Sequence, residues 1–200
     1  MAGEKTVRLN NRSERPDNIV LKEHEVMAKC TDIEKELPVF MRGFFAYLKG
    51  NVLPMTRLAY LTDIRFFCQY LIDNTGLTEA SRPREIKESE FREIVAADVN
   101  MFIDYCRSYS VEKDNEIVLY ENTNKTLARK KSSVSVLFKQ LYRDGILEKN
   151  ITDGFDPIRV PKASEREIKA LQDDEVMIML DAVTTGANIT EKEHQYWEKS

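Results

Sequence analysis

The chain has 200 residues, of which 42% are hydrophobic and 9% aromatic, enough apolar material for a packed core. Its net charge of -4 and pI near 5.4 exclude a uniformly basic nucleic-acid binder, so any DNA binding has to come from a local patch. The 32% charged content, with only 7 Gly and 6 Pro, favours long helices over a turn-rich β architecture.

The chain begins with a polar, aperiodic stretch, and we expect residues 1–30 to be a flexible N-terminal segment. A helical domain is expected over residues 31–150. Its first helix is predicted within 34–51 and ends at Gly50. The clearest helix follows over 53–76, since Pro54 suits a helix start and Gly76 a helix end. Residues 77–90 have dense mixed charge and a proline, which indicates an exposed connection.

A further helix is predicted within 91–109, entered at Asp98. It is followed by a polar loop around one short β-prone run, Ile117 to Tyr120, which could form a small extended arm. The last helix of the domain covers 124–144, a linker follows over 151–170, and residues 171–200 begin a second unit. The expected fold class is all-α.

Residues 124–144, "NKTLARKKSSVSVLFKQLYRD", separate into two stripes on an ideal helix. The predicted exposed stripe contains Lys125, Arg129, Ser132, Val136, Lys139 and Arg143, and the predicted core stripe contains Leu127, Val134, Leu137, Phe138 and Leu141. Residues 122–144 hold six basic side chains and one acidic one, whereas residues 171–200 hold seven acidic and two basic ones. The net charge therefore hides a strong asymmetry.

The usual signs of catalysis are missing from this sequence. His24 and His194 are far apart and belong to no metal-binding pattern, and there is no glycine-rich nucleotide loop or hydrolase elbow. Cys30, Cys68 and Cys106 are isolated and odd in number, which argues against a disulfide framework or a cysteine zinc site. We therefore expect no catalytic residue, metal, cofactor or small-molecule substrate.

The same features favour a reducing cytoplasm. No apolar run approaches the ~20 residues of a membrane span, and the first twenty residues contain no signal-peptide core. The expectation is a soluble, cytoplasmic protein without membrane contact.

Two segments together resemble the tyrosine recombinase family, the phage-integrase and Xer-type enzymes. "LPMTRLAYLTDIRFFCQYL" is similar to the family's Pro-x-Thr, Tyr and Asp-Leu/Ile pattern with paired aromatics, carried by Pro54, Thr56, Tyr60, Asp63, Ile64, Phe66 and Phe67. "ARKKSSVSVLFKQLYRDGILEKN" resembles its Arg-x-x-Ser helix and following Gly-x-Ile/Leu-x-x-Asn, carried by Arg129, Ser132, Leu137, Phe138, Gly145, Ile146 and Asn150. "VPKASEREIKALQDDEV" is similar to the linker and the opening of the catalytic domain.

The resemblance implies a SAM-like core-binding bundle of four or five helices, which forms half of a clamp around a DNA recombination site. It also implies a parent enzyme for DNA integration or recombination that cleaves with a tyrosine, uses no cofactor and self-associates on DNA. The family's catalytic residues all lie beyond the equivalent of residue 200, so this chain itself would not be catalytic. Two departures are Lys131, expected to reach off the core edge, and the long "DGFDPIRV" linker, which leaves the angle between the domains open.

The expected DNA-binding residues follow from the basic stripe and from the start of the 53–76 helix, where free backbone N–H groups favour a phosphate. They are Thr56, Arg57, Lys125, Arg129, Lys130, Ser132, Ser133 and Lys139. The aromatics Tyr60, Phe66, Phe67 and Phe138 are expected in the core. Three alternatives stay open: a merely solvated basic face, a helical protein-interaction module with an acidic partner, and a helix-turn-helix regulator without recombinase activity.

Overall fold

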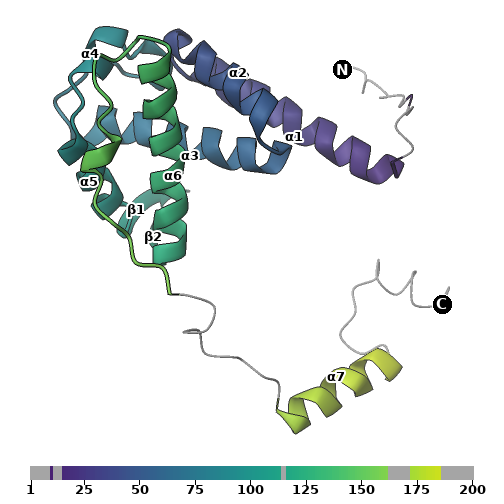
Figure 1. Ribbon diagram of the computed structural model, residues 1–200. Helices are drawn as coiled ribbons and strands as arrows, with labels where there is room; N and C mark the ends of the chain where they lie inside the picture. Colours follow the sequence, from purple (N-terminus) through teal and green to yellow (C-terminus); the bar gives the residue numbers. More distant parts are fainter. Residues whose placement is uncertain (1–9, 11–14, 114–115, 162–171, 186–200) are drawn as a thin grey trace. The chain divides into compact units, whose positions relative to one another are not determined.

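We analysed a computed structural model that describes residues 10, 15–113, 116–161 and 172–185 (Figure 1). The chain divides into two units, residues 1–160 and residues 161–200. Most of the described chain is helical, which confirms the mostly α-helical expectation. The first unit contains α1 Asp17–Glu36, α2 Arg42–Asn51, α3 Pro54–Asn74, α4 Glu88–Arg92, α5 Ala96–Tyr105, β1 Ser108–Lys113, β2 Glu116–Glu121 and α6 Asn124–Arg143, with short 3₁₀ turns at Val39–Met41, Pro83–Glu85 and Thr152–Gly154.

Helix α1 corrects the expectation of a flexible segment over residues 1–30. The helix begins at Asp17 and packs against α3, burying Val26, Cys30 and Ile33. These residues follow one another at i, i+4 and i+7, the spacing of a helix face. The apolar stripe is narrow and the other faces are charged, so low average hydrophobicity hid the pattern. Residues 1–9 and 11–14 lie outside the described residues.

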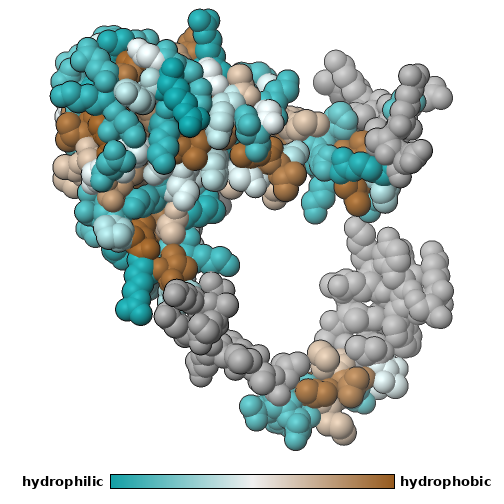
Figure 2. All heavy atoms as spheres, viewed as in Figure 1, coloured by the Kyte–Doolittle hydropathy of each residue, from teal (hydrophilic) through white to brown (hydrophobic). Residues whose placement is uncertain are grey.

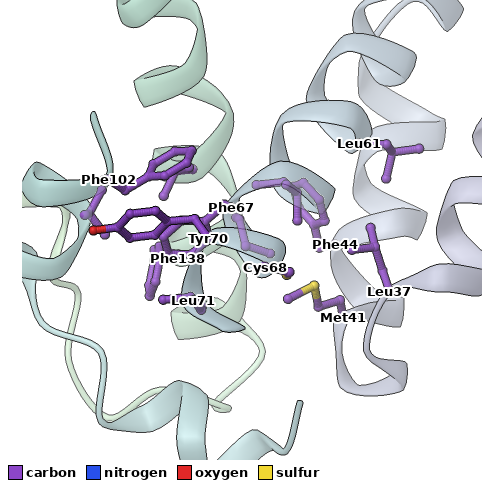
Figure 3. Packing of buried hydrophobic residues seen from close by; sticks show 14 of the residues in the cluster. Leu37, Met41, Phe44, Leu61, Phe67, Cys68, Tyr70, Leu71, Phe102 and Phe138 are labelled. Atoms are coloured by element: carbon purple, nitrogen blue, oxygen red, sulfur yellow. The ribbon is translucent and has the colours of Figure 1, made fainter. Parts of the chain in front are cut away.

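Helix α3 runs through the middle of the first unit and packs against both α1 and α6. Pro54 occupies its first turn, where a missing N–H costs no helical hydrogen bond. Figure 3 shows its buried side chains among those of the neighbouring helices. The ring centroid of Phe67 lies 4.9 Å from that of Phe102 and 6.1 Å from that of Phe138. This aromatic cluster fixes α6 against α3.

The β-prone run Ile117 to Tyr120 is part of a hairpin, in which β1 and β2 pair antiparallel. Tyr109 and Tyr120 are register partners and stack with ring centroids 5.1 Å apart on one face of the hairpin. On the other face Ile117 and Leu119 are 79% and 70% exposed. The hairpin adds a small sheet to a fold class expected to be all-α, and the run considered for an extended arm is part of its second strand.

Helix α6 ends at Arg143, and Gly145 shortly after it has a φ of 72°, which favours glycine. Residues 145–160 then return along the first unit. Lys131 Nζ donates to the carbonyl oxygens of Phe155 and Asp156, at 3.3 and 2.6 Å. Asn124 Nδ2 donates to the carbonyl oxygen of Arg159 at 3.0 Å. The first part of the expected 151–170 linker is therefore held on the first unit, and residues 162–170 lie outside the described residues.

In the second unit the structure describes one helix, α7 Asp173–Thr185, with an acidic first turn. Its Met177, Ile178, Met179 and Leu180 are exposed. Residues 186–200, which include His194 and three of the seven acidic residues of segment 171–200, lie outside the described residues. Over the described part of the chain, no helix is both long and apolar enough to cross a membrane.

Candidate nucleic-acid interface

Helix α6 has the two faces expected from its sequence. Leu127, Val134, Leu137, Phe138 and Leu141 are buried, and Lys125, Arg129, Ser132, Lys139 and Arg143 are exposed. The helix contains six Lys or Arg residues and no Asp or Glu. The hydroxyl of Thr123 accepts a hydrogen bond from the backbone N–H of Thr126 and caps the helix start. The exposed face of α6 is thus a basic surface free of carboxylates from within the helix.

A buried carboxylate meets the other side of this helix. Asp63 of α3 is 1% exposed and accepts a hydrogen bond from Ser133 Oγ at 2.7 Å. It also accepts one from Lys130 Nζ at 3.2 Å and one from Arg129 Nη1. Burial of a carboxylate is tolerated only when charged and polar partners compensate the lost hydration, as these three do. We call Asp63, Arg129, Lys130 and Ser133 the Asp63 network.

The network corrects two expected DNA contacts. Lys130 is 8% exposed, and its Nζ lies 4.7 Å from the ring centroid of Phe66, while Ser133 is fully buried. Both side chains point into the fold because they satisfy Asp63, so neither belongs to the surface. Ser133 lies at the edge of the predicted exposed stripe, but Lys130 shares the helix face of Leu127, Val134 and Leu137, so helical periodicity already places Lys130 on the buried side.

Arg57 is a third correction, because its side chain is also buried. Its guanidinium donates to Glu34 of α1 through Nη2 at 2.5 Å and through Nε at 3.1 Å. This two-pronged contact joins α3 to α1 and occupies the group expected to bind a phosphate. Thr56, one residue earlier in the first turn of α3, is half-buried and keeps part of its surface open.

An open hollow lies beside the exposed face of α6. It is lined by Tyr60, Ala128, Lys131, Ser132, Ser135, Val136, Lys139 and Ile158. Tyr60 is half-buried, so it borders this hollow instead of being fully enclosed in the core. The lining combines small side chains and hydroxyls with the cations Lys131 and Lys139. Such a surface suits a chain of phosphates with base edges between them.

Five of the eight expected contacts remain on the surface: Thr56, Lys125, Arg129, Ser132 and Lys139. Two residues that shape this site are not among the expected DNA contacts. Arg143 lies on the exposed stripe one turn beyond Lys139. Asp63 belongs to the recombinase-like motif, and its signal in the sequence is a carboxylate between the apolar residues Leu61 and Ile64 of α3.

The buried cysteines of the described chain are held in their unreactive thiol form. Burial raises the pKa of both Cys68 and Cys106 to about 12, which keeps these thiols protonated at neutral pH. Within the described ranges, no three His, Cys, Asp or Glu side chains gather in a group that could hold a metal ion.

Similarity to known proteins gives no independent guide to this surface. No protein-family model, curated protein or solved structure matches the chain.

Proposed function

We propose that this chain binds double-stranded DNA through the exposed face of α6, as the DNA-gripping part of a tyrosine recombinase or integrase. The observation that carries the proposal is a helix of 20 residues without a carboxylate, in a chain whose net charge is -4. Its exposed face holds the four cations Lys125, Arg129, Lys139 and Arg143. A helix that is merely solvated usually mixes charges of both signs at i and i+4. Clustered cations on one exposed helix are the footprint of phosphate binding.

The length and composition of the face support a duplex over another anion. Twenty helical residues span about 30 Å, enough to follow a groove of DNA over several base pairs. Lys125 and Lys139 lie near opposite ends, and Ser132 and Val136 lie between them. Cations would hold the backbone, and the small residues would let the helix approach base edges.

The recombinase assignment is supported by where its motif residues lie in the fold. Arg129 and Ser132 are on the exposed face of α6, and Asp63 on α3 binds Arg129 directly. Pro54 and Thr56 form the first turn of α3. In this proposal the catalytic tyrosine and its partners lie outside these 200 residues, and this part recognises a half-site of the recombination sequence.

Fluorescence anisotropy with a labelled duplex of mixed sequence, read across about 50 to 200 mM salt, tests DNA binding. Lys125→Ala and Arg129→Ala should each weaken binding and reduce the slope of log K against log salt by about 0.9. Lys49→Ala is the matched control, because Lys49 is an exposed lysine on α2, a different helix. Unchanged affinity and slope in both α6 variants would reject this surface as the interface.

Selection from a library of random duplexes separates a recombinase from a purely electrostatic binder. A recombinase part should enrich one defined half-site, and Ser132→Ala should relax the preference at particular base pairs more than it weakens binding overall. Recovery of unrelated sequences would leave only non-specific DNA binding.

A protein-interaction module is the second candidate, favoured by the exposed apolar face of the hairpin. Ile117 and Leu119 stand out from the surface next to Glu112 and Glu121, their register partners and neighbours. Figure 2 shows that much of the visible surface is hydrophilic, with apolar residues scattered across it. A stable oligomer in light scattering without DNA, combined with no affinity for the duplex, would favour this function over the first.

A further inference from the structure

The Asp63 network contains more positive than negative charge. One buried carboxylate faces two cations, Arg129 and Lys130, and both contact it together with the hydroxyl of Ser133. A buried pair of one acid and one base would already satisfy Asp63. The second cation therefore calls for a separate explanation.

The two cations use Asp63 differently. The Lys130 side chain is 10% exposed and packs over the ring of Phe66, so its charge is satisfied within the fold. The Arg129 side chain is 43% exposed although one of its terminal nitrogens binds Asp63. A guanidinium carries five N–H donors in a planar fork, so a bond to Asp63 leaves donors for a second acceptor. The surplus charge of the network is therefore presented to solvent by Arg129.

Among the described residues, no carboxylate supports the other exposed cations of α6 in this way. Lys125 and Lys139 make no hydrogen bond or ion pair with the part of the chain that the structure describes. Holding a long side chain in one orientation before binding reduces the conformational entropy lost on binding. Arg129 is thus the cation of this face whose orientation is fixed in advance.

We propose that Asp63 is a positioning residue for DNA binding: it holds Arg129 so that the free side of the guanidinium binds a backbone phosphate. This inference rests on the proposed function. It assigns Lys130 and Ser133 to the support of Asp63 and Arg129 to the contact with DNA. The fork geometry of Arg129 matters here, because one planar group must reach the carboxylate on one side and the phosphate on the other.

Arg129→Lys tests the fork directly, with little risk to folding because the side chain is partly exposed. An ammonium keeps the charge but cannot hold Asp63 and a phosphate in fixed opposite directions. In anisotropy with the same mixed-sequence duplex, Arg129→Lys should lose affinity about as much as Arg129→Ala, about tenfold. Lys125→Arg is the control and should bind like the unmodified chain. If Arg129→Lys binds normally while Arg129→Ala is weakened, Arg129 acts only as a charge and the proposal is wrong.

A double-mutant cycle tests the role of Asp63. In an Asp63→Asn background, Arg129→Ala should lower the affinity for the duplex about threefold or less, because the substituted side chain no longer holds the Arg129 guanidinium. Lys125→Ala should lower the affinity by the same factor in both backgrounds. Circular dichroism first establishes that the background variant is folded at the measuring temperature. A full cost of Arg129→Ala without Asp63 would overturn the positioning role. If neither Arg129→Ala nor Lys125→Ala changes the affinity of the otherwise unmodified chain for DNA, the proposed DNA interface is wrong, and this inference is wrong with it.

Discussion

Asp63 contributes both to the stability of this fold and to its candidate function. Replacing it by Asn keeps the size of the side chain but leaves Lys130 buried without a carboxylate. Removing one partner of a buried ion pair typically costs about 3 to 5 kcal/mol, because the remaining charge is uncompensated. We expect Asp63→Asn to lower the free energy of unfolding by that amount in urea denaturation.

Asp73→Asn is the matched control for this stability measurement. Asp73 lies on the same helix but is exposed, and its carboxylate binds the amide of Gln69 one turn away. Its replacement should change the free energy of unfolding by less than about 0.5 kcal/mol. Equal effects of the two changes would show that Asp63 makes no special contribution.

The three cysteines give a second prediction at the residue scale. Cys30, Cys68 and Cys106 are free and buried, and burial raises the pKa of all three thiols, to about 12 for Cys68 and Cys106. With Ellman's reagent at about pH 8, we expect no thiol to react within minutes in the native protein and all three to react in denaturant. Rapid modification of one thiol under native conditions would contradict the packing around it.

The raised thiol pKa values also set a direction for stability against pH. The unfolded chain loses these protons near pH 8.5, while the folded chain keeps them up to a higher pH. Stability from the neutral thiols is therefore complete below about pH 8.5 and falls as the pH rises beyond it.

The sequence does not predict which polar side chains are buried by a partner that is distant in the chain. The buried stripe of α6, from Leu127 to Leu141, was predictable because a 3.6-residue period is a local property. The burial of Lys130 and Ser133 depends on Asp63, almost 70 residues earlier. Arg57 depends in the same way on Glu34. No local pattern reveals such pairings, although the helical period does place Lys130 on the face of Leu127 and Val134; its basic character alone made it a candidate for the surface.

At the scale of elements, the 3₁₀ turn at Thr152–Gly154 packs closely on the start of α5. A Cβ atom at Gly154 would lie 2.7 Å from the Cβ of Ala96, and Asn100 of α5 donates to the Gly154 carbonyl oxygen at 3.1 Å. Gly154→Ala should therefore push the turn off α5 and destabilise the fold by about 1 to 3 kcal/mol in thermal or urea unfolding.

Gly50→Ala is the control for crowding at Gly154. Gly50 lies near the end of α2, and an added Cβ there meets no described atom within 4 Å. Alanine also favours the helix over glycine by up to about 1 kcal/mol, so this change should be neutral or stabilising. A neutral Gly154→Ala would mean that the turn is not pressed against α5.

At the scale of the whole molecule, the buried hydrophobic residues of the described chain all lie between Val26 and Phe155. A fragment of residues 1–160 should therefore unfold cooperatively, with a midpoint within about 3 °C of the full chain by circular dichroism or calorimetry. A broad, non-cooperative transition of the fragment would show that the first unit needs residues 161–200 to fold.

The hairpin has a consequence for behaviour at high protein concentration. Within the described residues the sheet consists of β1 and β2 alone, so both are edge strands whose outer backbone groups could pair with another chain. The exposed side chains of Ile117 and Leu119 would stabilise such pairing by burying apolar surface. Glu116 and Glu121, at the two ends of β2, would oppose it, because two copies of β2 would bring like charges together. The charge of these two residues therefore disfavours aggregation through intermolecular pairing of the exposed hairpin.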